Sequence, residues 1–86
     1  MPAYTLQVIT PQGIAYTGEV THSFIPAENG FVGVLANHSP FVTSSAGGRF
    51  EVRESDGTEK KFVAGIGFFE IAQNKATFLT QSFVQK

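Results

Sequence analysis

Apolar and polar residues alternate with a period of two along most of this chain. Near the N-terminus, Tyr4, Leu6 and Val8 alternate with Thr5 and other polar residues, which is the pattern of a β-strand buried on one face. No window repeats its apolar residues with the period of an amphipathic helix. The pattern therefore predicts a chain built from strands, each with one face toward a core.

Turn residues divide this pattern into short segments. Pro11-Gln12-Gly13 marks the first turn, Asp56-Gly57 marks a hairpin, and Asn37 is suited to a left-handed turn conformation. We expect a bulge or bend near Gly18. The expected strands are residues 4–10, 14–20, 21–26, 31–35, 41–44, 49–54, 58–64, 65–72, 75–80 and 81–84. About ten short strands predict an all-β fold, a flattened antiparallel β-sandwich, in a single domain spanning residues 1–86.

One stretch stands out because it carries no charged side chain from Asn29 to Gly48. A transmembrane helix needs about 20 mostly apolar residues, and this stretch is interrupted by polar residues, glycines and Pro40. It does not predict a membrane span. It is instead core strand and turn, a surface that meets another macromolecule, or both. Most of the charges lie together between Arg49 and Lys61, which predicts a hairpin with a mixed-sign face toward water.

The composition excludes several functional classes. The chain has 86 residues, a net charge of −1 at pH 7 and no cysteine. Without cysteines it has neither a disulfide framework nor a thiolate metal site. Without a surplus of basic residues it lacks the electrostatic footprint of a nucleic-acid-binding protein.

Few residues could carry chemistry. His38 beside Ser39 suggests a base and a nucleophile, but neighbours on an extended chain point to opposite faces. Asp56 is explained by its turn, and His22 with His38 is a poor set of metal ligands without cysteines or spaced carboxylates. The residues therefore predict no catalytic, cofactor-binding or metal site.

The glycines do not form a nucleotide-binding motif. Four glycines lie in apolar segments of the sequence, and none of them precedes a predicted helix whose N-terminus could hold a phosphate. We interpret them as positions that need a positive φ or a close approach of strands. They are Gly30, Gly33, Gly65 and Gly67.

Several short motifs follow one another with the order and spacing of a known family. They are Thr10-Pro11-Gln12-Gly13, Tyr16-Thr17-Gly18-Glu19-Val20, Pro26, Glu28 to Gly30, Gly33-Val34-Leu35, His38-Ser39-Pro40, Gly67-Phe68-Phe69-Glu70-Ile71 and Asn74-Lys75-Ala76-Thr77-Phe78-Leu79. As a set, they resemble the N-terminal β-sandwich domain of the epsilon subunit of F-type ATP synthases, called delta in mitochondria. The resemblance covers nearly the whole chain.

The resemblance implies a non-catalytic rotor subunit at the foot of the central stalk of a proton-translocating ATP synthase. Such a subunit links the gamma subunit to the c-ring and couples proton flow to ATP synthesis. It would be a peripheral membrane protein on the cytoplasmic, stromal or matrix face of the energy-coupling membrane, without a cofactor or small-molecule ligand. The implied c-ring contacts are Glu28, Asn29, Gly30, Phe31 and Val32. The implied gamma contacts are Val34, Leu35, His38, Pro40 and Phe41.

The sequence departs from the family pattern at three places. Ala36-Asn37 stands where the family commonly has Pro-Gly, and we expect Asn37 to keep the positive φ of that glycine. Ile66-Gly67 stands where two glycines are frequent. Many members continue into a two-helix C-terminal domain, whereas this sequence ends at Lys86, so we expect the short form of the subunit or a trimmed one.

Two other functions remain open from the residues alone. A free-standing β-sandwich adaptor would use the uncharged stretch to bind a protein, peptide or carbohydrate. A small hydrolase would use His38, which needs an acid and a nucleophile that the sequence does not indicate.

Overall fold

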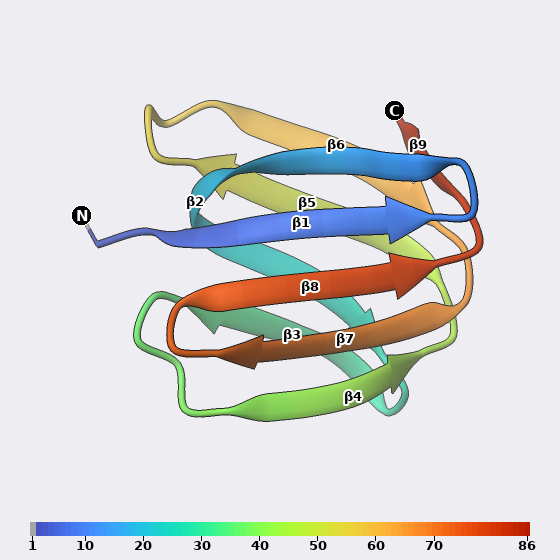
Figure 1. Ribbon diagram of the computed structural model, residues 1–86, viewed down its shortest axis with the longest axis horizontal. Coiled ribbons are helices and arrows are strands. Elements are labelled where there is room, and N and C mark those ends of the chain that lie inside the picture. The colour runs from blue at the N-terminus through green and yellow to red at the C-terminus, as the bar shows by residue number, and fades with distance from the viewer. Residues whose placement is uncertain (1) are drawn as a thin grey trace.

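A computed structural model describes residues 2–86 as a folded β-sheet with no helix (Figure 1). The nine strands are β1 (Tyr4–Thr10), β2 (Gly13–Ala27), β3 (Gly30–Leu35), β4 (Phe41–Ser45), β5 (Gly48–Glu54), β6 (Glu59–Ala64), β7 (Gly67–Ala72), β8 (Lys75–Thr80) and β9 (Phe83–Gln85). The all-β prediction is confirmed, with strand boundaries that mostly agree to within two residues. The two segments expected at residues 14–20 and 21–26 are one continuous strand, β2.

The strands form two layers because β2 is long enough to belong to both. The first half of β2 pairs with β1, and its second half pairs with β3 and β5. The front layer in Figure 1 contains β4, β7, β8 and β1, and the back layer contains β3, β5 and β6. Every pair is antiparallel except β1 with β8. This parallel pair is possible because a long stretch of chain separates the two strands.

The strand β2 changes layers at a bulge. The pairing register with β5 shifts between Val20 and His22, and Val20 and Thr21 are both buried. One extra residue interrupts the alternation in this way and bends a strand. We expected a bulge or bend near Gly18, and register shifts lie on both sides of it: one in the β1–β2 pair between Val8 and Ile9, and one between Val20 and His22. Gly18 itself pairs regularly with Leu6. A side chain at Gly18 would instead collide with the Tyr16 hydroxyl, 2.9 Å from the position of a Cβ.

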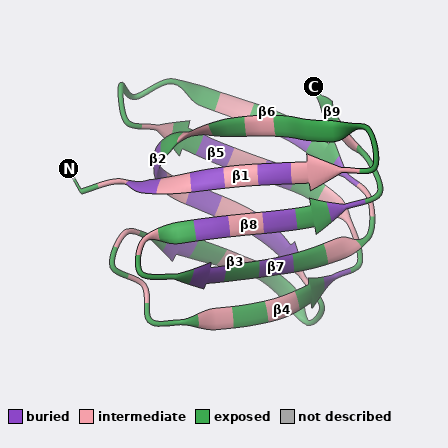
Figure 2. Cartoon of the chain, viewed as in Figure 1, coloured by how far each residue is buried: buried purple, intermediate pink, exposed green. Residues whose placement is uncertain are grey.

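Aromatic side chains fill much of the space between the layers. Phe50 and Phe78 are fully buried with ring centroids 5.0 Å apart. Phe83 closes one end of the core, where its ring lies 4.4 Å from Phe62. Burying each such side chain stabilises the fold by about 1.5–3 kcal/mol. Figure 2 shows buried residues alternating with partly buried ones along β1, and with partly buried or exposed ones along β8.

One polar contact crosses the core between the layers. The Tyr4 hydroxyl of β1 hydrogen-bonds the Ser23 hydroxyl of β2 and donates to the Val34 carbonyl oxygen of β3, at 2.9 Å. All three residues are buried. A buried hydroxyl needs such partners because it has lost its contacts with water.

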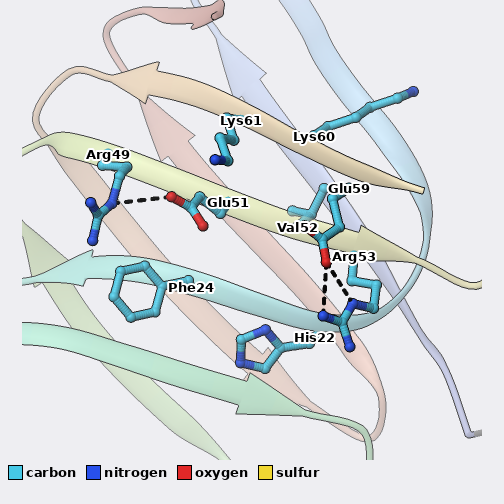
Figure 3. Close-up of a pocket in the computed structure, with 9 residues that line it drawn as sticks. All are labelled: His22, Phe24, Arg49, Glu51, Val52, Arg53, Glu59, Lys60 and Lys61. Atoms are coloured by element: carbon cyan, nitrogen blue, oxygen red, sulfur yellow. Dashed lines mark hydrogen bonds and ion pairs between the residues drawn. The ribbon is translucent and has the colours of Figure 1, made fainter. Parts of the chain in front are cut away.

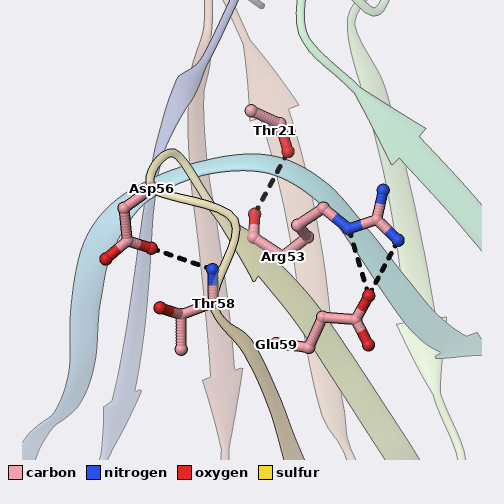
Figure 4. Close-up of polar contacts among 5 residues, drawn as sticks. All are labelled: Thr21, Arg53, Asp56, Thr58 and Glu59. Atoms are coloured by element: carbon pink, nitrogen blue, oxygen red, sulfur yellow. Dashed lines mark hydrogen bonds and ion pairs between the residues drawn. The ribbon is translucent and has the colours of Figure 1, made fainter.

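The turns use the residues that their backbone angles require. Asn37 has a φ of 65°, which confirms the expected left-handed conformation, and Asn74 in the β7–β8 turn has a φ of 61°. In the β5–β6 hairpin, Gly57 has a φ of 91° and the Asp56 carboxylate accepts a hydrogen bond from the Thr58 amide (Figure 4). This bond holds the pKa of the Asp56 carboxyl below its usual value.

Candidate partner-binding surfaces

The predicted c-ring contacts gather at the β2–β3 turn. Glu28, Asn29, Gly30 and Phe31 are exposed, and Val32 is partly buried. The last four line a hollow of about 250 Å³ that also involves Phe41. The structure thus brings the predicted c-ring contacts together and places Phe41, a predicted gamma contact, beside them.

The turn is tied down by one side-chain contact. The Ser44 hydroxyl of β4 donates to the Glu28 carboxylate at 2.7 Å. A Gly30 φ of 125° provides the sharp entry into β3. The turn is therefore polar at its tip, while Phe31 beside it is 51% exposed.

The predicted gamma contacts lie around the segment between β3 and β4. Leu35 is 55% exposed, Pro40 is exposed, and His38 and Phe41 are partly buried. The His38 ring contacts the Ser39 carbonyl oxygen through Nδ1 at 2.7 Å and lies 5.6 Å from the Phe41 ring. The His38 ring thus satisfies a backbone carbonyl next to it in the chain.

Val34 does not belong to this surface. Its side chain is fully buried and packs in the core. Alternation along β3 sends Val34 inward and its neighbour Leu35 outward. The Val34 side chain is therefore not part of the exposed surface, and its contact with gamma stays a prediction.

Apart from Phe41, which lines the hollow beside the β2–β3 turn, the two predicted sets lie toward opposite ends of β3 (Figure 1). Phe31 stands at one end and Leu35 at the other, both exposed on the outer face of the back layer. Phe31 stacks on Phe24 with centroids 4.7 Å apart, and the Arg49 guanidinium lies 5.2 Å from the Phe31 ring. This stacking fixes the orientation of the Phe31 ring. The surface around Phe31 is therefore rigid.

A third apolar surface was missed at the level of sequence. On the outer face of the front layer, Leu79 of β8 lies opposite both Ile9 of β1 and Phe68 of β7. Phe68, Leu79 and the nearby Ile66 are 45%, 48% and 63% exposed. Ile9, Ile66, Phe68 and Leu79, together with Pro11, line a hollow of about 260 Å³. We call Ile9, Ile66, Phe68 and Leu79 the apolar row.

A sequence signal for the apolar row exists. Val8-Ile9, Phe68-Phe69 and Phe78-Leu79 are pairs of consecutive apolar residues within strands. A strand with water on one face alternates, whereas a strand covered on both faces has continuous apolar residues. In the described chain the outer face of these strands is uncovered, so the pairs form an apolar surface of the kind that binds a partner.

The outer face of the back layer carries a charged groove of about 240 Å³ (Figure 3). Its two arginines are paired with carboxylates: Arg49 Nε with Glu51 at 3.1 Å, and Arg53 with Glu59 at 2.8 Å. These groups are largely exposed, which confirms the predicted mixed-sign face toward water. Such pairs contribute little to stability.

Within residues 2–86, burial perturbs the pKa of two tyrosine hydroxyls. Burial raises the pKa of the Tyr4 hydroxyl to about 12 and also raises the pKa of Tyr16, so both hydroxyls keep their protons. Residues 2–86 contain no group of three histidine, cysteine, aspartate or glutamate side chains that could hold a metal ion. In the same residues, no helix is long and apolar enough to cross a membrane.

Comparison with known proteins gives a consistent result. Residues 3–86 match the family described as "ATP synthase, Delta/Epsilon chain, beta-sandwich domain". The ATP synthase epsilon chain of Chlorobaculum tepidum is 37% identical over 79 residues, covering 92% of this chain and 90% of that protein. The epsilon chain of Leptospira interrogans serovar Lai is 39% identical over 75 residues, covering 87% of this chain and 58% of that protein.

Solved structures share the fold. A chain of the Euglena gracilis mitochondrial ATP synthase, in a cryo-EM structure of OSCP, F1 and the c-ring, has a TM-score of 0.89 and 25% identity. That match covers 99% of this chain and 55% of the Euglena chain. A chain of the Tetrahymena thermophila central stalk and c-ring has a TM-score of 0.78 at 9% identity, covering 92% and 63%, and shows the fold alone.

Proposed function

This chain belongs to the family of ATP synthase delta/epsilon beta-sandwich domains, and we propose that it joins the gamma subunit to the c-ring in the rotor of a proton-translocating ATP synthase. Members of the family are non-catalytic subunits, and the complex is associated with a membrane. The family match over residues 3–86 is the observation that carries the proposal. The similarity to a chain in an assembly of F1 and c-ring supports it.

The fold suits a part that transmits torque. Two packed layers of strands with a dense aromatic core deform little, since protein interiors have low compressibility. The polar link from Tyr4 to Ser23 and Val34 ties the layers together. A rigid body between two partners passes rotation from one to the other without absorbing it.

We assign the c-ring contact to the β2–β3 turn. Glu28 and Asn29 offer polar groups at its tip, and Phe31 and Val32 offer apolar surface beside them. The polar tip fits the polar loops that the resemblance implies for the ring. In this arrangement the chain sits on the cytoplasmic, stromal or matrix side of the membrane.

We assign the gamma contact to Leu35, His38, Pro40 and Phe41, and we propose that gamma also covers the apolar row, which is a separate surface on the outer face of the front layer. Four residues alone are too few, because a stable interface has roughly 20–30 residues on each side and buries about 800 Å² per partner. The apolar row supplies additional exposed surface of the kind that permanent interfaces bury.

Binding to purified gamma subunit from the same source, measured by calorimetry, tests this assignment. Leu35 and Phe68 are about half exposed, so Leu35→Asp and Phe68→Asp should leave the fold intact. Each should weaken binding by about 10- to 100-fold, because each places a charge where an apolar side chain is buried. The matched control is Val63→Asp, since Val63 is 46% exposed on β6 of the back layer and should bind like the parent chain.

The two variants have separate consequences. A Phe68→Asp chain that binds like the parent removes the apolar row from the interface, and an unaffected Leu35→Asp chain removes the β3 end. A folded parent chain that does not bind gamma at high micromolar concentration contradicts the rotor proposal. The adaptor function would then be the better account of the exposed apolar surface.

A further inference from the structure

The segment before β4 is held by a reciprocal pair of asparagines. The Asn37 amide N–H donates to Asn74 Oδ1 at 2.7 Å, and Asn74 Nδ2 donates to Asn37 Oδ1 at 3.0 Å. The pair joins residues 36–40 to the β7–β8 turn, which lies beside them at the same end of the molecule (Figure 1). We call Asn37 and Asn74 the asparagine clamp.

The clamp is anchored in the front layer. The Asn74 carbonyl oxygen accepts a hydrogen bond from the Thr5 amide of β1 at 3.0 Å. Asn37 and Asn74 both have a positive φ, 65° and 61°, which few residues other than glycine tolerate. The backbone conformation aims the two side chains at each other, so conformation and contact depend on the same two residues.

The segment that the clamp holds has few other ties. Within the described residues, the remaining side-chain hydrogen bond of residues 36–40 is local, from the His38 ring to Ser39. Packing continues from His38 to Phe41 and from Phe41 to Phe69, with centroids 5.6 and 6.5 Å apart. Loss of the clamp would therefore free the segment without unfolding the sandwich.

We propose that the asparagine clamp holds residues 36–40 in the shape that gamma binds, and that it thereby sets the affinity of the complex. This role rests on the proposed function, in which His38 and Pro40 meet gamma. A segment that is already ordered loses less conformational freedom on binding than a mobile one, and the difference appears as affinity. Asn37 and Asn74 are positioning residues, since they need not touch the partner.

Glycine substitutions separate the side-chain contact from the backbone conformation. Glycine adopts a positive φ readily but has no amide group. Both substitutions therefore keep the turns. Asn74→Gly deletes both hydrogen bonds of the clamp, whereas Asn37→Gly keeps the backbone amide and deletes only the bond to Asn37 Oδ1. Gln73→Gly is the matched control, because Gln73 has a φ of 52° in the same turn, and its side chain is exposed.

The experiment measures gamma affinity by calorimetry and amide hydrogen exchange of the free domain for these variants. Asn74→Gly should weaken binding about three- to tenfold, and Asn37→Gly should weaken it less, because Asn37→Gly keeps the amide bond to Asn74 Oδ1. The double variant should lose little more than Asn74→Gly alone, because that substitution already removes both bonds. Exchange should accelerate at the amides of residues 37–39 in the clamp variants, and Gln73→Gly should match the parent in both measurements.

The outcomes distinguish the clamp from the function on which it rests. If the parent binds gamma and the clamp variants bind equally well, the clamp has no role in affinity and the rotor proposal stands. If the two single effects multiply in the double variant, Asn37 and Asn74 act separately and the clamp is wrong. A parent chain that does not bind gamma overturns the proposed function and, with it, the clamp's role in affinity.

Discussion

Removal of the Tyr4 hydroxyl tests how the two layers are held together. Tyr4→Phe keeps the buried ring but deletes the hydrogen bonds to Ser23 and to the Val34 carbonyl. The Ser23 hydroxyl is fully buried, so it cannot turn to water instead. The substitution therefore leaves two polar groups without their partner in the middle of the core.

The expected cost follows from the two lost bonds. Each hydrogen bond contributes about 0.5–1.5 kcal/mol net, and a buried group left unpaired adds to this, giving about 2–3 kcal/mol in total. A domain of 86 residues has a stability of about 4–13 kcal/mol. The loss is a large share of this total and corresponds to a fall in Tm of about 10–20 °C.

Urea unfolding followed by circular dichroism measures the change. Ser23→Ala should cost less than Tyr4→Phe, because the Tyr4 hydroxyl still donates to the Val34 carbonyl. The double variant should cost less than the sum of the two, since the hydroxyls depend on each other. A Tyr4→Phe cost below about 0.5 kcal/mol, or full additivity, would refute the proposed link between the layers.

Three further predictions follow from the structure. Burial raises the pKa of Tyr4 from 10.0 to about 12, so the folded chain retains a proton that the unfolded chain loses in alkali. This group should therefore leave the free energy of unfolding unchanged below pH 10 and lower it between about pH 10 and 12. Tyr4→Phe should reduce that fall in urea titrations at alkaline pH. Gly67→Ala should lower Tm markedly in a thermal scan, because the added Cβ would lie 2.1 Å from the Leu79 carbonyl oxygen. Gly33→Ala should lower Tm less in the same scan, because its Cβ would contact only the His22 ring, at 3.1 Å. Lys61→Glu should change the free energy of unfolding by at most about 1 kcal/mol, since Lys61 is exposed, and loss of folding would show that the facing of β6 is misassigned.

The strands and turns could be predicted because local rules determine them. Alternation places Tyr4, Leu6 and Val8 inside, and the Asp56-Gly57 hairpin and Asn37 take the expected turn conformations. These features depend on residues close in sequence. The parallel pairing of β1 with β8 depends on the packing of distant segments, which the pattern does not encode.

The bulge and the surfaces were harder to predict. Gly18 looked like a bend, but it makes room for the Tyr16 ring, a contact between side chains that spacing alone does not reveal. Val34 was placed on a surface because the resemblance assigns the whole segment from Val34 to Phe41 to the gamma-facing side, and only the facing of β3 separates Val34 from Leu35. The apolar row was not predicted because the sequence does not distinguish an exposed apolar residue from the core residue next to it. Only the arrangement of the strands in the sheet shows which face is exposed to solvent.

Site-directed cross-linking in the assembled ATP synthase tests the central claim most directly. The chain has no cysteine, so a single introduced thiol can carry a photoreactive group without side reactions. From Asn29→Cys, at the β2–β3 turn, we predict cross-links to the c-ring, and from Pro40→Cys, before β4, we predict cross-links to gamma. Labelling of neither partner from either position, in complexes that contain the chain, would contradict a subunit that bridges gamma and the ring.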